Sequence, residues 1–289
     1  MSIIPHQLAE YIKKRRCIAF VGAGFSRICG MPDWAGLMLS LLEYCQKLDA
    51  DSNKIEACRI ELDHGNLVEA ADTLRDMLQP AEYGDFLKDQ FSWDRYAKAP
   101  THIHDRMKTR LHNLEAAPWA GIITTNFDEL IGSVCNGWFS CSGDDRSLGY
   151  VLSRNERFYV RLHSATWNKS KVILSSEDYY KVYLENSEIK TVRPFLKASM
   201  LSHQFVFIGC SLETRLLELR KELYNTFDGE IPVAYALLSD TQQNRDRAER
   251  LVKFAIRPIF YKVESGPNPP HQAVDQFLEE AAQLGRNIS

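Results

Sequence analysis

Short, almost continuous apolar runs recur along the chain and are bounded by turn residues. We predict strands at 17–21, 121–125, 157–162, 172–174, 205–209, 232–238 and 256–261. Runs that are apolar on both faces are typical of a parallel sheet covered by helices on both sides. The pattern therefore predicts an α/β protein.

Between the first two predicted strands the apolar positions follow helical spacing. An example is "NLVEAADTLRDML", in which Leu67, Ala71, Leu74 and Leu78 fall on one face. This segment is too long for one crossover helix, so we predict a mostly helical module inserted over 36–118. The whole chain, 1–289, is then one domain.

Later helices are predicted over 190–203, 213–226, 240–254 and 271–285, where they alternate with the late strands. Alternating strands and helices favour a Rossmann-like, doubly wound and mostly parallel sheet.

Composition excludes several classes of protein. Hydrophobic residues make up 45% and charged residues 25%, and the net charge is -3. Because basic residues are not in excess, we expect no direct nucleic-acid binding. No apolar segment is long enough to cross a membrane, and we expect a cytoplasmic protein. The seven cysteines form no Cys-x-x-Cys pair, so we expect neither a disulfide framework nor a bound metal.

The first predicted strand leads directly into Gly22-Ala23-Gly24. In doubly wound sheets such a turn lets backbone N–H groups approach a pyrophosphate, although two glycines also occur in tight turns that bind nothing. Arg27 stands where a dehydrogenase fingerprint has a third small residue, and no Gly-x-x-x-x-Gly-Lys-Ser/Thr run is present. Hydride transfer and nucleotide triphosphate hydrolysis are therefore disfavoured.

Polar groups also follow three other predicted strands. They are Thr124-Thr125-Asn126-Phe127-Asp128, Arg161-Leu162-His163 and Gly209-Cys210-Ser211. Because the carboxyl ends of parallel strands share one sheet edge, these groups are expected to meet beside the glycine turn. Taken singly, the Asn-x-Asp segment also fits an Asx turn or helix cap, and the histidine fits a purely structural role.

Together these segments resemble the sirtuin-like family. The matches are Gly22-Ala23-Gly24-Phe25-Ser26, Gly30-Met31-Pro32-Asp33, the Thr124–Asp128 segment, His163-Ser164 and Gly209-Cys210-Ser211. Ser164 stands where the family usually has glycine. The resemblance implies an NAD site. The cysteine spacings cannot supply the zinc ribbon of classical sirtuin deacylases, and the helical insertion and the "TTNFD" segment make the chain similar to bacterial NAD-hydrolysing effectors of antiphage defence.

That resemblance implies an NAD glycohydrolase, which releases nicotinamide and ADP-ribose and depletes cellular NAD. Activity would be restrained until the protein assembles with itself or with a partner such as an ATPase or an Argonaute-like protein. NAD is the substrate, and no metal is expected.

The expected roles follow from residue chemistry. The backbone of Gly22, Ala23 and Gly24 and the Ser26 hydroxyl would contact phosphate, with Arg27 as a charge partner. Asn126 would orient the attacking water, Asp128 would bind the ribose side or stabilise developing charge, and His163 would act as general base. Other residues expected to bind NAD are Pro32, Asp33, Thr125, Gly209 and Ser211.

Two other functions stay open. One is an NAD-dependent protein deacylase or ADP-ribosyltransferase, which would need an open groove for a peptide. The other is a catalytically silent sensor of NAD or ADP-ribose.

Overall fold

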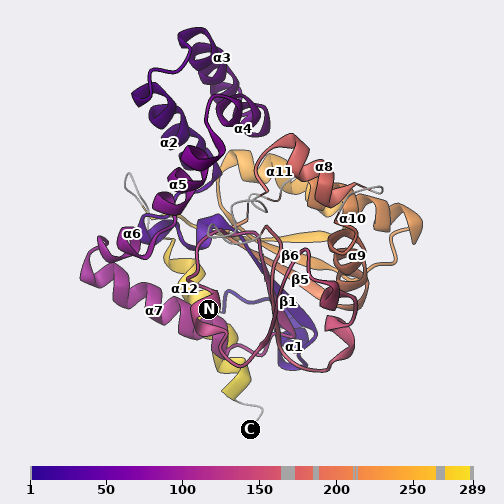
Figure 1. Ribbon diagram of the computed structural model, residues 1–289. Helices are drawn as coiled ribbons and strands as arrows, with labels where there is room; N and C mark the ends of the chain where they lie inside the picture. Colours follow the sequence, from indigo (N-terminus) through magenta and orange to yellow (C-terminus); the bar gives the residue numbers. More distant parts are fainter. Residues whose placement is uncertain are drawn as a thin grey trace.

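The computed structural model describes residues 2–163, 173–184, 189–210, 212, 214–264 and 271–286 (Figure 1). Its seven strands are β1 Cys17–Val21, β2 Gly121–Thr124, β3 Phe139–Ser142, β4 Phe158–Arg161, β5 Gln204–Ile208, β6 Ala234–Ser239 and β7 Ile256–Tyr261. They form one sheet in the order β3-β4-β2-β1-β5-β6-β7, and every pairing is parallel. The α/β, doubly wound fold predicted from the sequence is confirmed.

Strand order reverses next to β1, because the chain adds strands first on the β2 side and later on the β5 side. In such sheets the crevice beyond the carboxyl ends of the strands at the reversal is the usual ligand site. The topology therefore predicts a ligand site among the loops that follow β1, β2 and β5.

The helices are α1 His6–Lys13, α2 Trp34–Lys47, α3 Ser52–Asp63, α4 Leu67–Asp76, α5 Pro80–Gln90, α6 Trp93–Ala97, α7 Thr101–Ala116, α8 Ser176–Tyr183, α9 Val192–Ser202, α10 Thr214–Thr226, α11 Gln242–Val252 and α12 Gln272–Arg286. Successive residues of β1 alternate between two cores, with Cys17, Ala19 and Val21 in one and Ile18 and Phe20 in the other. This alternation follows from the two-residue period of a strand. Both faces of the sheet are therefore buried.

One core contains α1, α7 and α12, and the other contains residues of α8, α9 and α10. Figure 1 shows α7 and α12 lying along one side of the sheet, whereas α2, α3 and α4 project beyond it. The segment between β1 and β2 is helical, but a separate inserted module with boundaries at 36 and 118 stays a prediction.

One strand prediction needs correction, and one strand was missed. The strand expected at 172–174 is wrong for Ile173 and Leu174, which are buried but lie outside any strand; residue 172 is outside the described residues. These two side chains lead into the capping box of α8, so their apolar character reflects burial rather than sheet pairing. The edge strand β3 was not predicted, because "FSCS" is short and only partly buried.

In the described part of the chain, no helix is both long and apolar enough to cross a membrane.

Candidate active site

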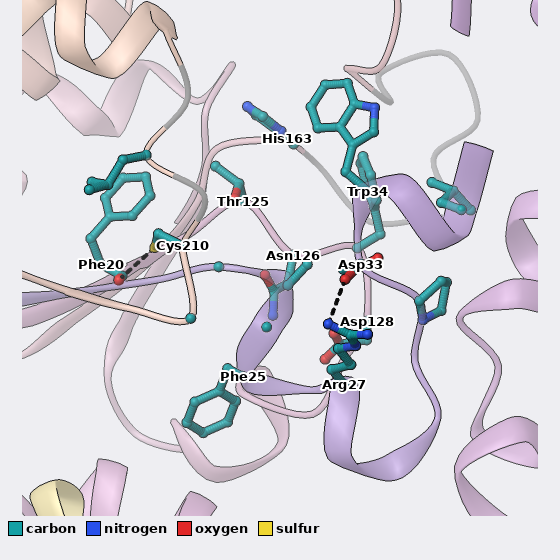
Figure 2. A pocket seen from close by; sticks show the side chains of 18 of the residues that line it. Phe20, Phe25, Arg27, Asp33, Trp34, Thr125, Asn126, Asp128, His163 and Cys210 are labelled. Atoms are coloured by element: carbon teal, nitrogen blue, oxygen red, sulfur yellow. Dashed lines mark hydrogen bonds and ion pairs between the residues drawn. The ribbon is translucent and has the colours of Figure 1, made fainter. Parts of the chain in front are cut away.

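A cavity of about 290 Å³ lies where the strands around β1 end (Figure 2). This volume is near the lower end of the range for small-molecule sites, about 300–1,000 Å³. Four loops that follow strands contribute much of its lining: Gly22, Ala23, Gly24 and Arg27 after β1, Thr125, Asn126 and Asp128 after β2, His163 after β4, and Gly209 and Cys210 after β5. The structure thus brings together segments that are far apart in sequence.

The glycine turn packs directly against the loop after β5. A Cβ atom on Gly22 would lie 2.7 Å from the Gly209 carbonyl oxygen, and one on Gly24 would lie 2.9 Å from it. Gly209 itself has φ +63°, and its Cβ would lie 2.4 Å from the Phe25 nitrogen. The glycines are therefore required by contact between two protein loops, and not only by approach of a ligand.

This packing also occupies the N–H groups of the turn. Gly22 N–H donates to the Ile208 carbonyl at 3.0 Å and Gly24 N–H to the Gly209 carbonyl at 2.9 Å. Phe25 N–H and Ser26 N–H close the 3₁₀ turn onto Gly22 and Ala23. Fewer backbone donors are left for phosphate than the sequence predicts.

Asn126 is 3% exposed and is held on two sides. Its backbone N–H donates to the Thr124 hydroxyl at 3.0 Å, and that hydroxyl donates to the Val21 carbonyl, which ties the end of β2 to β1. Its side-chain Nδ2 donates to Ser26 Oγ at 3.3 Å, whereas its Oδ1 has no partner within the described structure. A buried acceptor without a partner costs about 1–3 kcal/mol, so a ligand or a bound water is expected to satisfy it.

Asp128 is also 3% exposed and lies beneath the cavity. Its Oδ1 accepts the Leu130 N–H at 3.1 Å, as in an Asx turn. Burial raises the pKa of its carboxyl, against hydrogen bonds from Ser26 and Leu130 and the nearby charge of Arg161. Asp128 therefore has a structural bond as well as a place in the cavity wall.

His163 is buried, and its Nε2 shares a hydrogen bond of 2.7 Å with the Tyr183 hydroxyl. Its ring also lies edge-on to Tyr179, with centroids 5.6 Å apart. Burial lowers the pKa of His163 to about 3, slightly opposed by the charge of Asp178. At neutral pH the imidazole is therefore uncharged and can accept a hydrogen bond.

The helix that carries Tyr183 is attached to the projecting helices. Arg75 of α4 donates to both carboxylate oxygens of Asp178 at 3.0 and 3.1 Å, and to the Ser175 hydroxyl at 2.7 Å. Asp72 of the same helix accepts the Ser176 N–H at 2.8 Å. The position of His163 is thus connected through α8 to α4.

The loop after the glycine turn forms another part of the wall. Asp33 caps α2 by accepting the Gly36 N–H at 2.9 Å, and its second oxygen pairs with Arg27 Nη1 at 3.1 Å. Pro32 lies beside them in the lining. Because the Arg27 side chain is 59% exposed, this ion pair contributes little to stability.

Most residues predicted to bind NAD line the cavity, with two exceptions. Ser26 is fully buried and connects Asn126 to Asp128, so it supports the wall rather than forming it. Ser211 and Ser164 lie outside the described residues. The roles of all these residues in binding and catalysis stay predictions.

Three residues at or beside the cavity were not predicted. Trp34 lines the cavity, stacks on Tyr179 with ring centroids 5.6 Å apart, and its Nε1 has no hydrogen-bond partner among the described residues. Tyr183 and Arg110 come from α8 and α7. No sequence motif marks them, although the tyrosines at 179 and 183 have the i, i+4 spacing of one helix face.

The fold is α/β, and the four converging loops are consistent with the resemblance to the sirtuin-like family; the comparisons agree with that resemblance. Residues 120–259 match the family described as "SIR2-like domain". Over this part of the chain the protein is similar to SIR2-like domains.

A curated relative is Defense-associated sirtuin 2 of Bacillus subtilis, which is 26% identical over 215 residues. The match covers 71% of this chain and 19% of the relative, so the chain spans about a fifth of that protein's length.

SIR2-like domains use NAD, and the cavity has features that suit it: a buried acceptor without a partner, a neutral histidine and a glycine turn. Within the described ranges, no group of three or more His, Cys, Asp or Glu side chains is arranged to hold a metal ion.

Proposed function

We propose that the protein is an NAD glycohydrolase. The observation that carries this proposal is the Asn126 Oδ1 acceptor, which is buried at the meeting point of the four loops and has no partner in the described structure. An amide oxygen held in this way can accept a hydrogen bond from a water molecule and so fix its direction of attack. The neutral His163 in the same cavity supports the proposal.

In the proposed reaction the bond between nicotinamide and ribose C1′ breaks, and nicotinamide leaves with the bonding electrons. Positive charge develops on the ribose ring, as in other glycosidic cleavages. Water then forms the new bond to C1′ and loses a proton to solvent. The products are nicotinamide, ADP-ribose and a proton, so no oxidant or metal is needed.

Each side chain has a separate role in the proposed reaction. Asn126 orients the water, and Ser26 holds the amide through Nδ2 so that Oδ1 stays available. His163 shares Nε2 with Tyr183, which leaves Nδ1 as the ring nitrogen for a ribose hydroxyl or the water. With its pKa lowered to about 3, His163 orients a hydroxyl better than it stores a proton. Asp128 supports developing positive charge from beneath.

We further propose that this activity serves antiphage defence through loss of cellular NAD. The similarity to Defense-associated sirtuin 2 supports this role. Such an activity needs restraint in a healthy cell, and assembly with a second copy or with a partner protein is the proposed trigger.

Time-resolved chromatography of NAD tests the proposal, with the purified protein alone and with the products of neighbouring genes. Intact protein should release nicotinamide and ADP-ribose in equal amounts. Asn126→Ala should slow release by about 100-fold or more, the size of effect seen when one preorganised polar group is removed from an active site.

Asn136→Ala is a matched control, because Asn136 is exposed and its side chain donates to the nearby Ser133 carbonyl, away from the cavity lining. Its rate should equal that of the intact protein. NAD that is bound but never cleaved, in every mixture, would contradict the hydrolase and favour a sensor. Cleavage only with an acylated peptide would favour a deacylase.

A further inference from the structure

Arg110 of α7 is a buried cation in the cavity wall that the reaction described above does not use. Its side chain is 2% exposed. Nε donates to Asp275 Oδ1 at 2.6 Å and Nη1 donates to the Phe25 carbonyl at 2.8 Å. Nη2 is buried and has no partner within the described residues. The guanidinium is therefore fixed by two bonds and retains an unused donor.

The charge of Arg110 is only partly balanced by Asp275. The same carboxylate also pairs with Arg106, so one acid serves two guanidinium groups. The charges of this cluster act on the nearby His271. Burial lowers the pKa of His271, and the positive charges of Arg110, Arg27 and Arg106 lower it further, whereas the charge of Glu264 raises it. Oε1 of Glu264 accepts the Gln272 N–H at 2.9 Å, whereas its Oε2 is buried and has no partner among the described residues.

The neighbouring glycine turn lacks the donors that an anion needs. The N–H groups of Gly22 and Gly24 are bonded to the loop after β5, and those of Phe25 and Ser26 close the turn. Among the described residues, only Ala23 N–H in this turn has no acceptor. A phosphate group usually needs several donors, and the Nη2 of Arg110, which carries two N–H groups and has no partner among the described residues, can supply them together with a positive charge.

We propose that Arg110 is the side chain that binds the diphosphate of the substrate, together with Ala23 N–H. The ligand class is a nucleoside diphosphate ester, and this inference rests on the proposed function for the identity of that ester. Asp275 and the Phe25 carbonyl act as positioning groups, because they hold the guanidinium beside the turn. A buried charge that the protein only half balances is then satisfied when the ligand binds.

Isothermal titration with ADP-ribose and with adenosine tests this inference without requiring turnover. Arg110→Gln should weaken ADP-ribose binding at least tenfold and change adenosine binding less than twofold, because adenosine carries no phosphate. Arg59→Gln is the control: Arg59 is exposed, pairs with Glu56 on α3 and does not line the cavity. Its effect on either ligand should stay below threefold.

Thermal unfolding of each variant reports whether it folds. If Arg110→Gln does not fold, Arg110→Lys replaces it; the charge is retained but the fork is lost, so ADP-ribose should still bind more weakly and adenosine should not. Unchanged ADP-ribose affinity, equal losses for both ligands, or no ADP-ribose binding by the intact protein would overturn the assignment. Intact protein that binds ADP-ribose through Arg110 without cleaving NAD would overturn only the hydrolase proposal.

Discussion

Two sides of the cavity are held in different ways. The glycine turn after β1 is fixed by backbone hydrogen bonds to the loop after β5, at distances of 2.9 and 3.0 Å. His163 is fixed by side chains, through Tyr183 and then through the contact of α8 with α4. The side with the glycine turn requires glycine at the points where the two loops touch. The side with His163 requires particular side chains that hold the imidazole in place.

The largest effect should come from adding one methyl group to the backbone-held side. Gly209→Ala places a Cβ 2.4 Å from the Phe25 nitrogen at a residue with φ +63°. We expect the free energy of unfolding to fall by about 2–3 kcal/mol, because strain and steric overlap act together. Denaturant titration measures this change.

Gly149→Ala is the control, since a Cβ there meets nothing within 4 Å. Its unfolding free energy should change by less than about 0.5 kcal/mol. Equal stability of the two variants would show that the contact between the two loops does not restrict position 209.

Low pH should reduce the free energy of unfolding through His163, on the side of the cavity that is held by side chains. Its folded-state pKa of about 3 lies below the ordinary value of about 6.5, so the folded protein binds fewer protons between these values. Stability from the neutral imidazole is complete above the ordinary value and is lost as the pH falls toward 3. The loss approaches about 1.4 kcal/mol per pH unit.

Comparison of the intact protein with His163→Gln isolates this contribution. The raised pKa of Asp128 acts in the opposite direction, but it is present in both proteins. The difference in unfolding free energy should shrink as the pH is lowered from 7 to 5. A difference that stays constant over this range would mean that His163 is not buried as a neutral group.

The smallest effect should come from removing one hydroxyl on the same side. Tyr183→Phe leaves the ring in place but deprives His163 Nε2 of its partner at 2.7 Å. We expect about 1 kcal/mol less stability and nicotinamide release slowed several-fold. Tyr150→Phe, at an exposed position, is the control and should change neither. A rate that falls without any loss of stability would instead indicate direct contact between the hydroxyl and substrate.

The glycine turn and the loop after β5 could be predicted from the sequence better than the surroundings of His163. Strand runs and glycines are local signals, so β1, β2, β4 and β5 and the loops after them could be located from residue order alone. The convergence of Asn126, His163 and Gly209 follows from parallel pairing. It needs no knowledge of side-chain contacts.

The remaining parts depend on contacts between distant segments. Arg110 reaches the cavity from α7, and Tyr183 reaches His163 from α8; neither has a motif around it. Ser26 illustrates a second limit, because its neighbours in sequence suggested a phosphate contact while packing placed its hydroxyl beneath Asn126. Residue type and position in a motif predict proximity to a site, but they do not predict which atom faces the ligand.

The span of the cavity in the sequence has a consequence for synthesis of the protein. Residues that line it run from Phe20 in β1 to Val274 in α12, and the wall near His163 depends on the contact of α4 with α8. A chain emerging from the ribosome has β1 and the glycine turn long before Gly209 and Arg110's partner Asp275. Since non-local contacts form late in folding, the site is completed only after α12 has left the ribosome. A chain that stops before α12 would therefore lack the assembled cavity.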